Sequence, residues 1–160
     1  EQPLDAMAGT ALESLAEAIR SSGVIAQGSS GVALCSGGAD SAALAAGLAR
    51  VLGPDAVLAL HLNYALRPDS DQDEAACGAL CARLGLELLV ERPRLGEGNV
   101  QAEAREARYA AAEALRRQRG LDWVATGHTR LASGRSAGTG EARRPARSSA
   151  APPGRPWPPR

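Results

Sequence analysis

Short apolar runs alternate along the chain with longer stretches in which apolar residues recur every three or four positions. The runs lie at residues 31–35, 56–62, 86–90 and 123–126. Their brevity and continuity are typical of strands buried on both faces of a parallel sheet. Helical spacing marks four further segments, and these predict helices that begin near Thr10, after the first run, near Ser70 and near Val100.

Two of the expected helix starts carry capping-box patterns. Thr10-Ala11-Leu12-Glu13 has the Thr-x-x-Glu form, and Ser70-Asp71-Gln72-Asp73 has the same form with Asp in the last position. We therefore expect the first helix to run from Thr10 to Ser21-Ser22-Gly23, and the third to begin at Ser70.

Strands that alternate with helices of this length predict βαβ units. We expect an α/β fold: a doubly wound, mostly parallel sheet of four strands with helices on both faces. The expected divisions are an N-terminal helix at 1–23, a folded domain at 24–130 and a tail at 131–160. The tail is rich in Arg, Pro and Gly and has only two large apolar side chains, so we expect it to be disordered.

The formal net charge of zero hides two unlike pieces. Residues 1–128 carry 11 Arg against 17 acidic residues, net −6, and residues 129–160 carry 7 Arg against one, net +6. No apolar run approaches the roughly 18 residues of a membrane span, and no secretory signal pattern opens the sequence. Three cysteines fit neither a disulfide framework nor a paired zinc site. We expect a cytoplasmic protein with no membrane partner.

The clearest chemical motif is Ser36-Gly37-Gly38-Ala39-Asp40-Ser41, between the first strand and the helix that follows. Two glycines permit a tight turn and a close backbone approach, and a helix N-terminus offers free N–H groups, so these six residues form a candidate anion cradle. Asp40 beside bound phosphates is a candidate Mg²⁺ ligand. The alternative is an ordinary Gly-rich turn with Asp and Ser as helix caps.

This motif resembles the pyrophosphate loop of the N-type ATP pyrophosphatases. The segment from His61 to Glu74 (HLNYALRPDSDQDE), the 99–109 segment with its Glu103-Ala104-Arg105 and Arg108-Tyr109 pairs, and Gly127-His128 resemble the tRNA(Ile)-lysidine synthetases more narrowly. The resemblance covers about residues 24–130 and implies a Rossmann-like ATP-binding domain. Tyr64 stands where that family commonly has a second His, and the family pattern stops after Arg130.

The resemblance also implies an activity. With ATP and Mg²⁺, such a ligase adenylates the C2 carbonyl oxygen of the wobble cytidine of tRNA(Ile), and free L-lysine then displaces AMP. Residues 36–41 would hold the phosphates, with Asp40 on the metal. Because the pattern stops early and residues 1–128 are acidic, we expect the 160-residue chain, as a truncated catalytic domain, to transfer no lysine by itself.

Four side chains are candidate catalytic residues: Asp40, His61, Arg105 and His128. Both histidines follow the carboxyl ends of expected strands, where ligands bind in open α/β sheets, and either a functional role or a solvated or backbone-bonded ring fits them. Arg105 and Arg108 share a helix face, from which they reach phosphate or pair with neighbouring glutamates. Cys77 and Cys81 share an apolar face and are expected in the core.

Three other functions stay open on the sequence. A tRNA-thiolating ligase of the same loop family would need further thiols near the loop, which Cys35 alone does not supply. A nucleotide-binding module without turnover and an inert truncated product are the others. The sequence also leaves a homodimer open.

Overall fold

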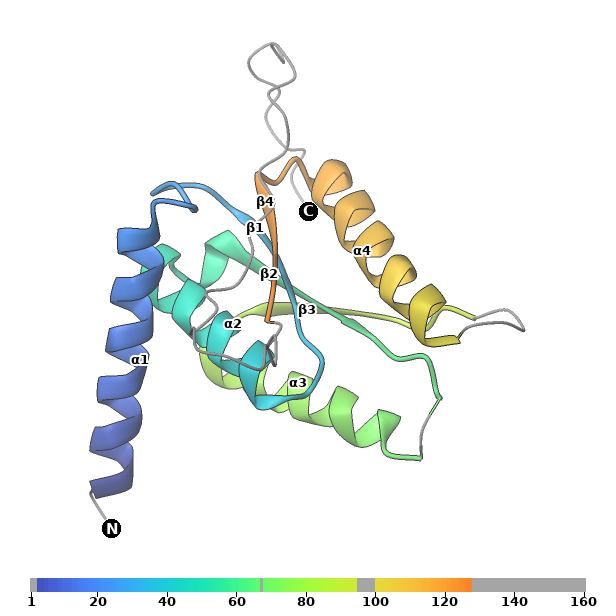
Figure 1. The fold of residues 1–160 in the computed structure, drawn as a ribbon, viewed down its shortest axis with the longest axis horizontal. Coiled ribbons are helices and arrows are strands. Elements are labelled where there is room, and N and C mark those ends of the chain that lie inside the picture. The colour runs from blue at the N-terminus through green and yellow to red at the C-terminus, as the bar shows by residue number, and fades with distance from the viewer. Residues whose placement is uncertain (1–2, 67, 95–99, 128–160) are drawn as a thin grey trace, which may run out of the picture.

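The computed structural model describes residues 3–66, 68–94 and 100–127. The elements in chain order are α1 (Pro3–Ser22), β1 (Gly31–Leu34), α2 (Ala39–Leu52), the 3₁₀ turn η1 (Pro54–Ala56), β2 (Val57–Leu62), α3 (Ser70–Leu84), β3 (Glu87–Glu91), α4 (Val100–Arg119) and β4 (Trp123–Thr126) (Figure 1). No helix in these ranges is both long enough and apolar enough to cross a bilayer.

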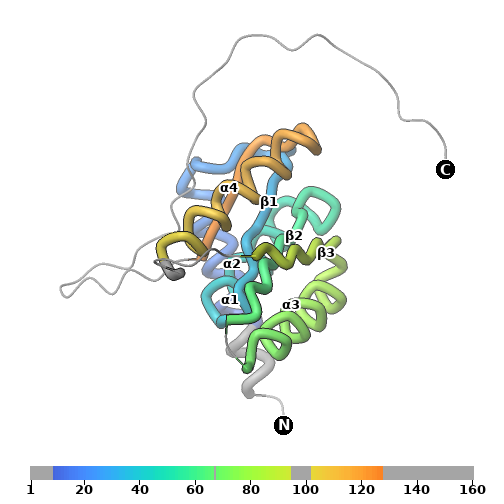
Figure 2. Tube along the Cα trace, turned by 90° about the vertical axis from the view of Figure 1, so that its right-hand side faces the viewer, coloured from blue at the N-terminus to red at the C-terminus, as the bar shows by residue number. Residues whose placement is uncertain are grey.

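The four strands form one parallel sheet in the order β3-β2-β1-β4. The chain moves outward from β1 to β2 and β3, and then returns to the other side of β1. Helices α2 and α3 cover one face of the sheet, with α1 against α2, and α4 covers the opposite face (Figures 1 and 2). The expected doubly wound α/β fold is confirmed, and its strand order reverses between β1 and β4.

Alternating side chains of the strands build two cores. On the face of α2 and α3, Ala33, Val57 and Ala59 pack with Leu48. On the α4 face, Leu34, Leu58 and Leu60 pack with Ala112 and Leu115. β1 and β2 are buried along their whole length, as their continuous apolar sequences predict. The core has few large side chains, so parts of it are filled by side chains that pack directly on glycine backbone. The Trp123 indole covers Gly31, where an added Cβ would lie 2.1 Å from the ring.

The expected start of the first helix is wrong. Helix α1 already includes Pro3, so Thr10 lies inside it, and the Thr10 carbonyl accepts the Ser14 hydroxyl at 3.0 Å. Glu13 does not close a capping box; its carboxylate accepts from Arg50 on α2 at 2.6 Å. Because α1 starts at Pro3, a residue suited to the first turn of a helix, Thr10 has helix on both sides and cannot act as the cap. The contact with α2 comes later in α1, where Gly47 gives close approach to Leu15 and Ile19.

The start of α3 is confirmed, although not its cap. α3 begins at Ser70, but Asp69 is the N-cap residue, and its backbone carbonyl accepts the N–H groups of Gln72 and Asp73 at 3.0 Å. β3 begins one residue later than expected, at Glu87, and β4 has the expected bounds. The expected disorder of 131–160 lies outside the described residues.

Candidate phosphate-binding site

The 36–41 loop leaves the carboxyl end of β1, at the point where the strand order reverses. In doubly wound sheets this crevice is where ligands bind. The loop turns at Gly37, whose φ of 87° strains any side-chain-bearing residue, and α2 begins at Ala39. The position expected from the sequence, between a buried strand and a helix N-terminus, is therefore confirmed.

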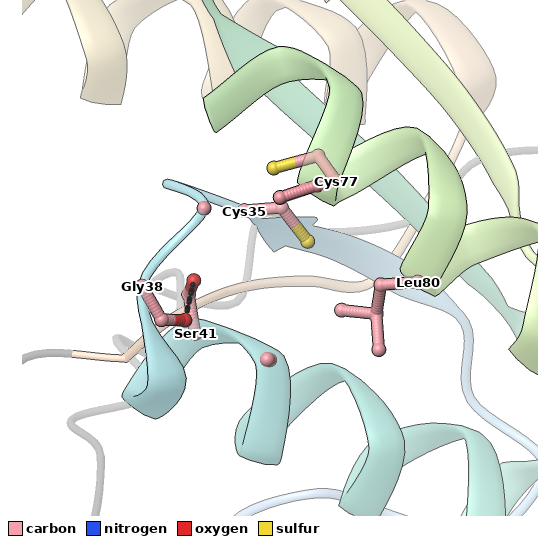
Figure 3. Close-up of a pocket in the computed structure, with 8 residues that line it drawn as sticks. Cys35, Gly38, Ser41, Cys77 and Leu80 are labelled. Atoms are coloured by element: carbon pink, nitrogen blue, oxygen red, sulfur yellow. Dashed lines mark hydrogen bonds between the residues drawn. The ribbon is translucent and has the colours of Figure 1, made fainter. Parts of the chain in front are cut away.

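Two hydroxyl groups fix the shape of this loop. Ser41, 4% exposed, donates to the Gly38 carbonyl at 2.9 Å (Figure 3). It accepts the Ser36 N–H at 3.1 Å. Since the single Ser41 proton is donated to that carbonyl, the Ser36 hydroxyl is the donor in their 3.1 Å contact. Ser36 Oγ in turn accepts the Gly38 N–H at 3.4 Å. The two serines of the motif thus fix the backbone at Ser36 and Gly38, on either side of Gly37.

Backbone encloses the loop on two sides. A Cβ added to Gly37 would lie 2.8 Å from Cβ and 2.9 Å from Cα of Asp73, at the start of α3. A Cβ added to Gly127, just after β4, would lie 2.9 Å from the backbone of Asp40 and Ser41. These contacts join α3, the loop and the exit of β4. Asp40 itself is exposed, in the first turn of α2.

Asn63 joins the exit of β2 to the acidic start of α3. Its side chain, 4% exposed, donates to Asp71 at 3.0 Å and to Glu74 at 2.8 Å, and accepts the Ala65 N–H at 2.9 Å. Ala65 has a positive φ of 53°, which is uncommon for a residue with a Cβ. No local pattern predicts this role of Asn63, because its partners lie 8 and 11 positions further along the chain, on α3.

His61 lies inside the fold. Its ring is 4% exposed, and Nδ1 lies 2.7 Å from the carbonyl oxygen of Cys35, the residue before the loop. Nε2 has no hydrogen-bond partner in the part of the chain that the structure describes. Of the two alternatives open on the sequence, this geometry matches the backbone-bonded ring; a catalytic role stays a prediction.

A cavity of about 140 Å³ lies between the loop and α3, lined by Cys35, Gly37, Gly38, Ser41, Ala42, Ala76, Cys77 and Leu80 (Figure 3). The core placement of Cys77 and Cys81 is confirmed. The interpretation that Cys35 is the only thiol near the loop is wrong, because α3 brings Cys77 beside it. Burial, reinforced by the neighbouring thiols, raises the pKa of Cys35 to about 12 and that of Cys77 to about 11. Both are neutral thiols at physiological pH.

The arginines of α4 lie on the face of the sheet opposite to α2 and α3. Arg105 is exposed and its guanidinium carbon lies 5.9 Å from the centre of the Tyr109 ring. Tyr64, after β2, donates its hydroxyl to the Ala104 carbonyl at 2.7 Å. Burial raises the pKa of Tyr64, and a hydrogen bond with Arg108 opposes that rise. Arg108 therefore contacts Tyr64 at the exit of β2, and Arg105 lies over Tyr109 of its own helix. His128 lies outside the described residues.

Comparison with known protein families matches residues 10–131 to the PP-loop domain. The chain belongs to the PP-loop family. The matched residues include the 36–41 loop, Gly37 and Gly127 with their backbone contacts, and all four strands of the described sheet.

Within the PP-loop family, the chain is similar to individual tRNA(Ile)-lysidine synthases. The chain is 43% identical over 101 residues to a tRNA(Ile)-lysidine synthase of Thermus thermophilus, a match that covers 59% of this chain and 19% of that protein. It is 40% identical over 106 residues to the tRNA(Ile)-lysidine synthase of Ralstonia nicotianae, covering 58% and 22%. The matched part thus spans about a fifth of these relatives.

Among solved structures, the NH3-dependent NAD synthetase of Campylobacter jejuni, determined with a nitrate ion, has a TM-score of 0.56. The likeness covers 72% of this chain and 54% of that one at 22% identity. At this identity it supports the fold alone, and it agrees with the doubly wound sheet.

Proposed function

We propose that this PP-loop domain is the ATP-binding catalytic part of a cytoplasmic ligase that modifies tRNA(Ile). In the proposed reaction ATP is cleaved between its α and β phosphates, the wobble cytidine is adenylated at its C2 carbonyl oxygen, and L-lysine displaces AMP. The observation that carries the proposal is the conjunction of a fixed loop at the strand-order reversal with 40–43% identity to tRNA(Ile)-lysidine synthases.

The 36–41 loop would act by positioning the phosphates. Its backbone N–H groups and the N-terminal end of α2 favour negative charge, and the serine network holds them in place before the ligand arrives. Such preorganisation lowers the cost of accommodating charge that develops on leaving pyrophosphate.

The Asp40 carboxylate suits magnesium. In residues 3–66, 68–94 and 100–127 no three His, Cys, Asp or Glu side chains are arranged around a common metal position. Mg²⁺ needs no such cage, because it binds one or two carboxylates together with substrate phosphates and water. An exposed hard-oxygen donor in the first turn of α2 fits this demand, and bound Mg²⁺ would neutralise phosphate charge. Arg105 and His128 are proposed for substrate contact.

The thiolation alternative gains one specific observation, the Cys35–Cys77 pair in the cavity beside the loop. The two proposals differ in what cysteine removal does. A ligase that transfers lysine keeps its product when either thiol is replaced by a serine hydroxyl, whereas a sulfur-transferring enzyme that uses them loses it.

A segment exchange tests the proposal. The matched 101 residues of the Thermus thermophilus relative are replaced by those of this chain, and the chimera is incubated with MgATP, labelled lysine and tRNA(Ile) carrying a wobble cytidine. We expect label in the tRNA with AMP and pyrophosphate released, unchanged by Cys77→Ser. A folded chimera that binds tRNA but yields no labelled product, or yields ADP and phosphate, contradicts the proposal. The 160-residue chain alone is expected to yield none.

A further inference from the structure

The chain leaves the sheet at Cys35 with both of its backbone groups bonded to β2. The Cys35 N–H donates to the Leu60 carbonyl at 2.9 Å, which continues the ladder one residue beyond β1. The Cys35 carbonyl is bonded instead by a side chain, His61 Nδ1, at 2.7 Å. Because a carbonyl only accepts, Nδ1 is the donor in this bond. Nε2 is buried without a hydrogen-bond partner among the described residues.

His61 holds this carbonyl from the face of the sheet covered by α3. Side chains alternate along β2, so His61 shares the face of Val57 and Ala59. Cys77 of α3 reaches the same point, with Sγ 3.4 Å from Nδ1. Cys77 and Gly37 also line the same cavity beside the loop. Side chains from two elements therefore meet at the root of the loop.

Leaving Nε2 buried without a partner costs stability. An apolar residue of similar size would avoid that cost, but the Cys35 carbonyl would lose its donor where the backbone turns away from the sheet. The shorter of the two contacts of Nδ1, the one to the Cys35 carbonyl, thus lies at the point where the chain enters the loop.

We propose that His61 is a positioning residue: its Nδ1–H holds the Cys35 carbonyl and thereby orients the 36–41 loop for phosphate, and Nε2 exchanges no proton with substrate. The proposal rests on the proposed function in that the ligand of the loop is taken to be MgATP.

Two amide variants separate the ring nitrogens. Asn places its side-chain N–H near the position of Nδ1, and Gln places it near that of Nε2. We expect His61→Asn to bind MgATP within about 3-fold of the parent in calorimetric titration, and His61→Gln to bind about 10-fold or more weakly, since it loses one short hydrogen bond. A proton-transfer role for Nε2 predicts that the Asn variant fails in the lysine-transfer chimera, whereas positioning predicts turnover close to the parent.

Amide hydrogen exchange of residues 36–41 without nucleotide gives a readout that needs no ligand. We expect parent-like exchange in the Asn variant and faster exchange in the Gln variant. If the parent binds no MgATP but the exchange pattern holds, the proposed function fails and the positioning role stands. The positioning role is overturned if the His61→Asn variant lacks the parent's protection of residues 36–41, or if the His61→Gln variant keeps it.

Discussion

Replacing Asp40 with Asn is expected to weaken MgATP binding by about 10- to 100-fold, the loss that follows from removing one charged contact of about 1.5–3 kcal/mol. The loss should depend on the metal. With EDTA present, ATP is expected to bind the parent and the variant equally, because the proposed role of the carboxylate is to hold Mg²⁺ and not to contact phosphate. Calorimetric titration with and without Mg²⁺ measures the affinity for MgATP and the affinity for metal-free ATP.

Asp55→Asn is the matched control for that experiment. It removes the same charge from another exposed side chain, in η1 at the amino end of β2 and so at the opposite edge of the sheet. MgATP affinity in the control is expected to stay at the parent value. Equal losses in the two variants would mean that net charge, and not a metal contact, determines the affinity.

Gly127→Ala is expected to weaken phosphate binding by the 36–41 loop, although no residue of the loop is changed. The added Cβ would lie 2.9 Å from the backbone of Asp40 and Ser41, and backbone cannot move aside as a flexible side chain does. Overpacking of this kind costs about 1–3 kcal/mol. If the loop is the part that shifts, MgATP affinity falls by about 10- to 100-fold. Urea unfolding and calorimetry on the same sample divide the effect between stability and binding.

Gly78→Ala provides the comparison for this glycine. Gly78 lies within α3, and an added Cβ there meets nothing within 4 Å. Ala in a helix interior is favoured over Gly by about 0.5–1 kcal/mol, so the control should gain stability and keep its affinity. A Gly127→Ala variant that behaves like Gly78→Ala would show that the exit of β4 does not support the loop.

The sheet and the loop were predictable because their signals are local. β1 and β2 are continuous apolar runs, and Ser36-Gly37-Gly38 interrupts the first of them where the chain must turn. Once the strand order is known, right-handed crossovers account for α2 and α3 on one face of the sheet and α4 on the other.

The missed features depend on contacts between distant segments. Cys77 comes beside Cys35 because α3 packs over the loop, and 42 positions of sequence separate the two thiols. Thr10 carries a local capping pattern that α1 does not use, since the helix already begins at Pro3. The bond from His61 to Cys35 likewise needs the register of β1 against β2. A periodic pattern specifies which face a residue occupies but not its partner there.

Hydrogen exchange of the 160-residue chain with and without MgATP tests the central claim most directly. If the 36–41 loop holds the triphosphate, nucleotide should slow amide exchange in residues 36–42 more than anywhere else in the described part of the chain, and pyrophosphate should compete with ATP for this protection. Binding of MgATP that protects another segment and leaves residues 36–42 unchanged, or no binding at millimolar nucleotide, would contradict the assignment of this loop as the phosphate site.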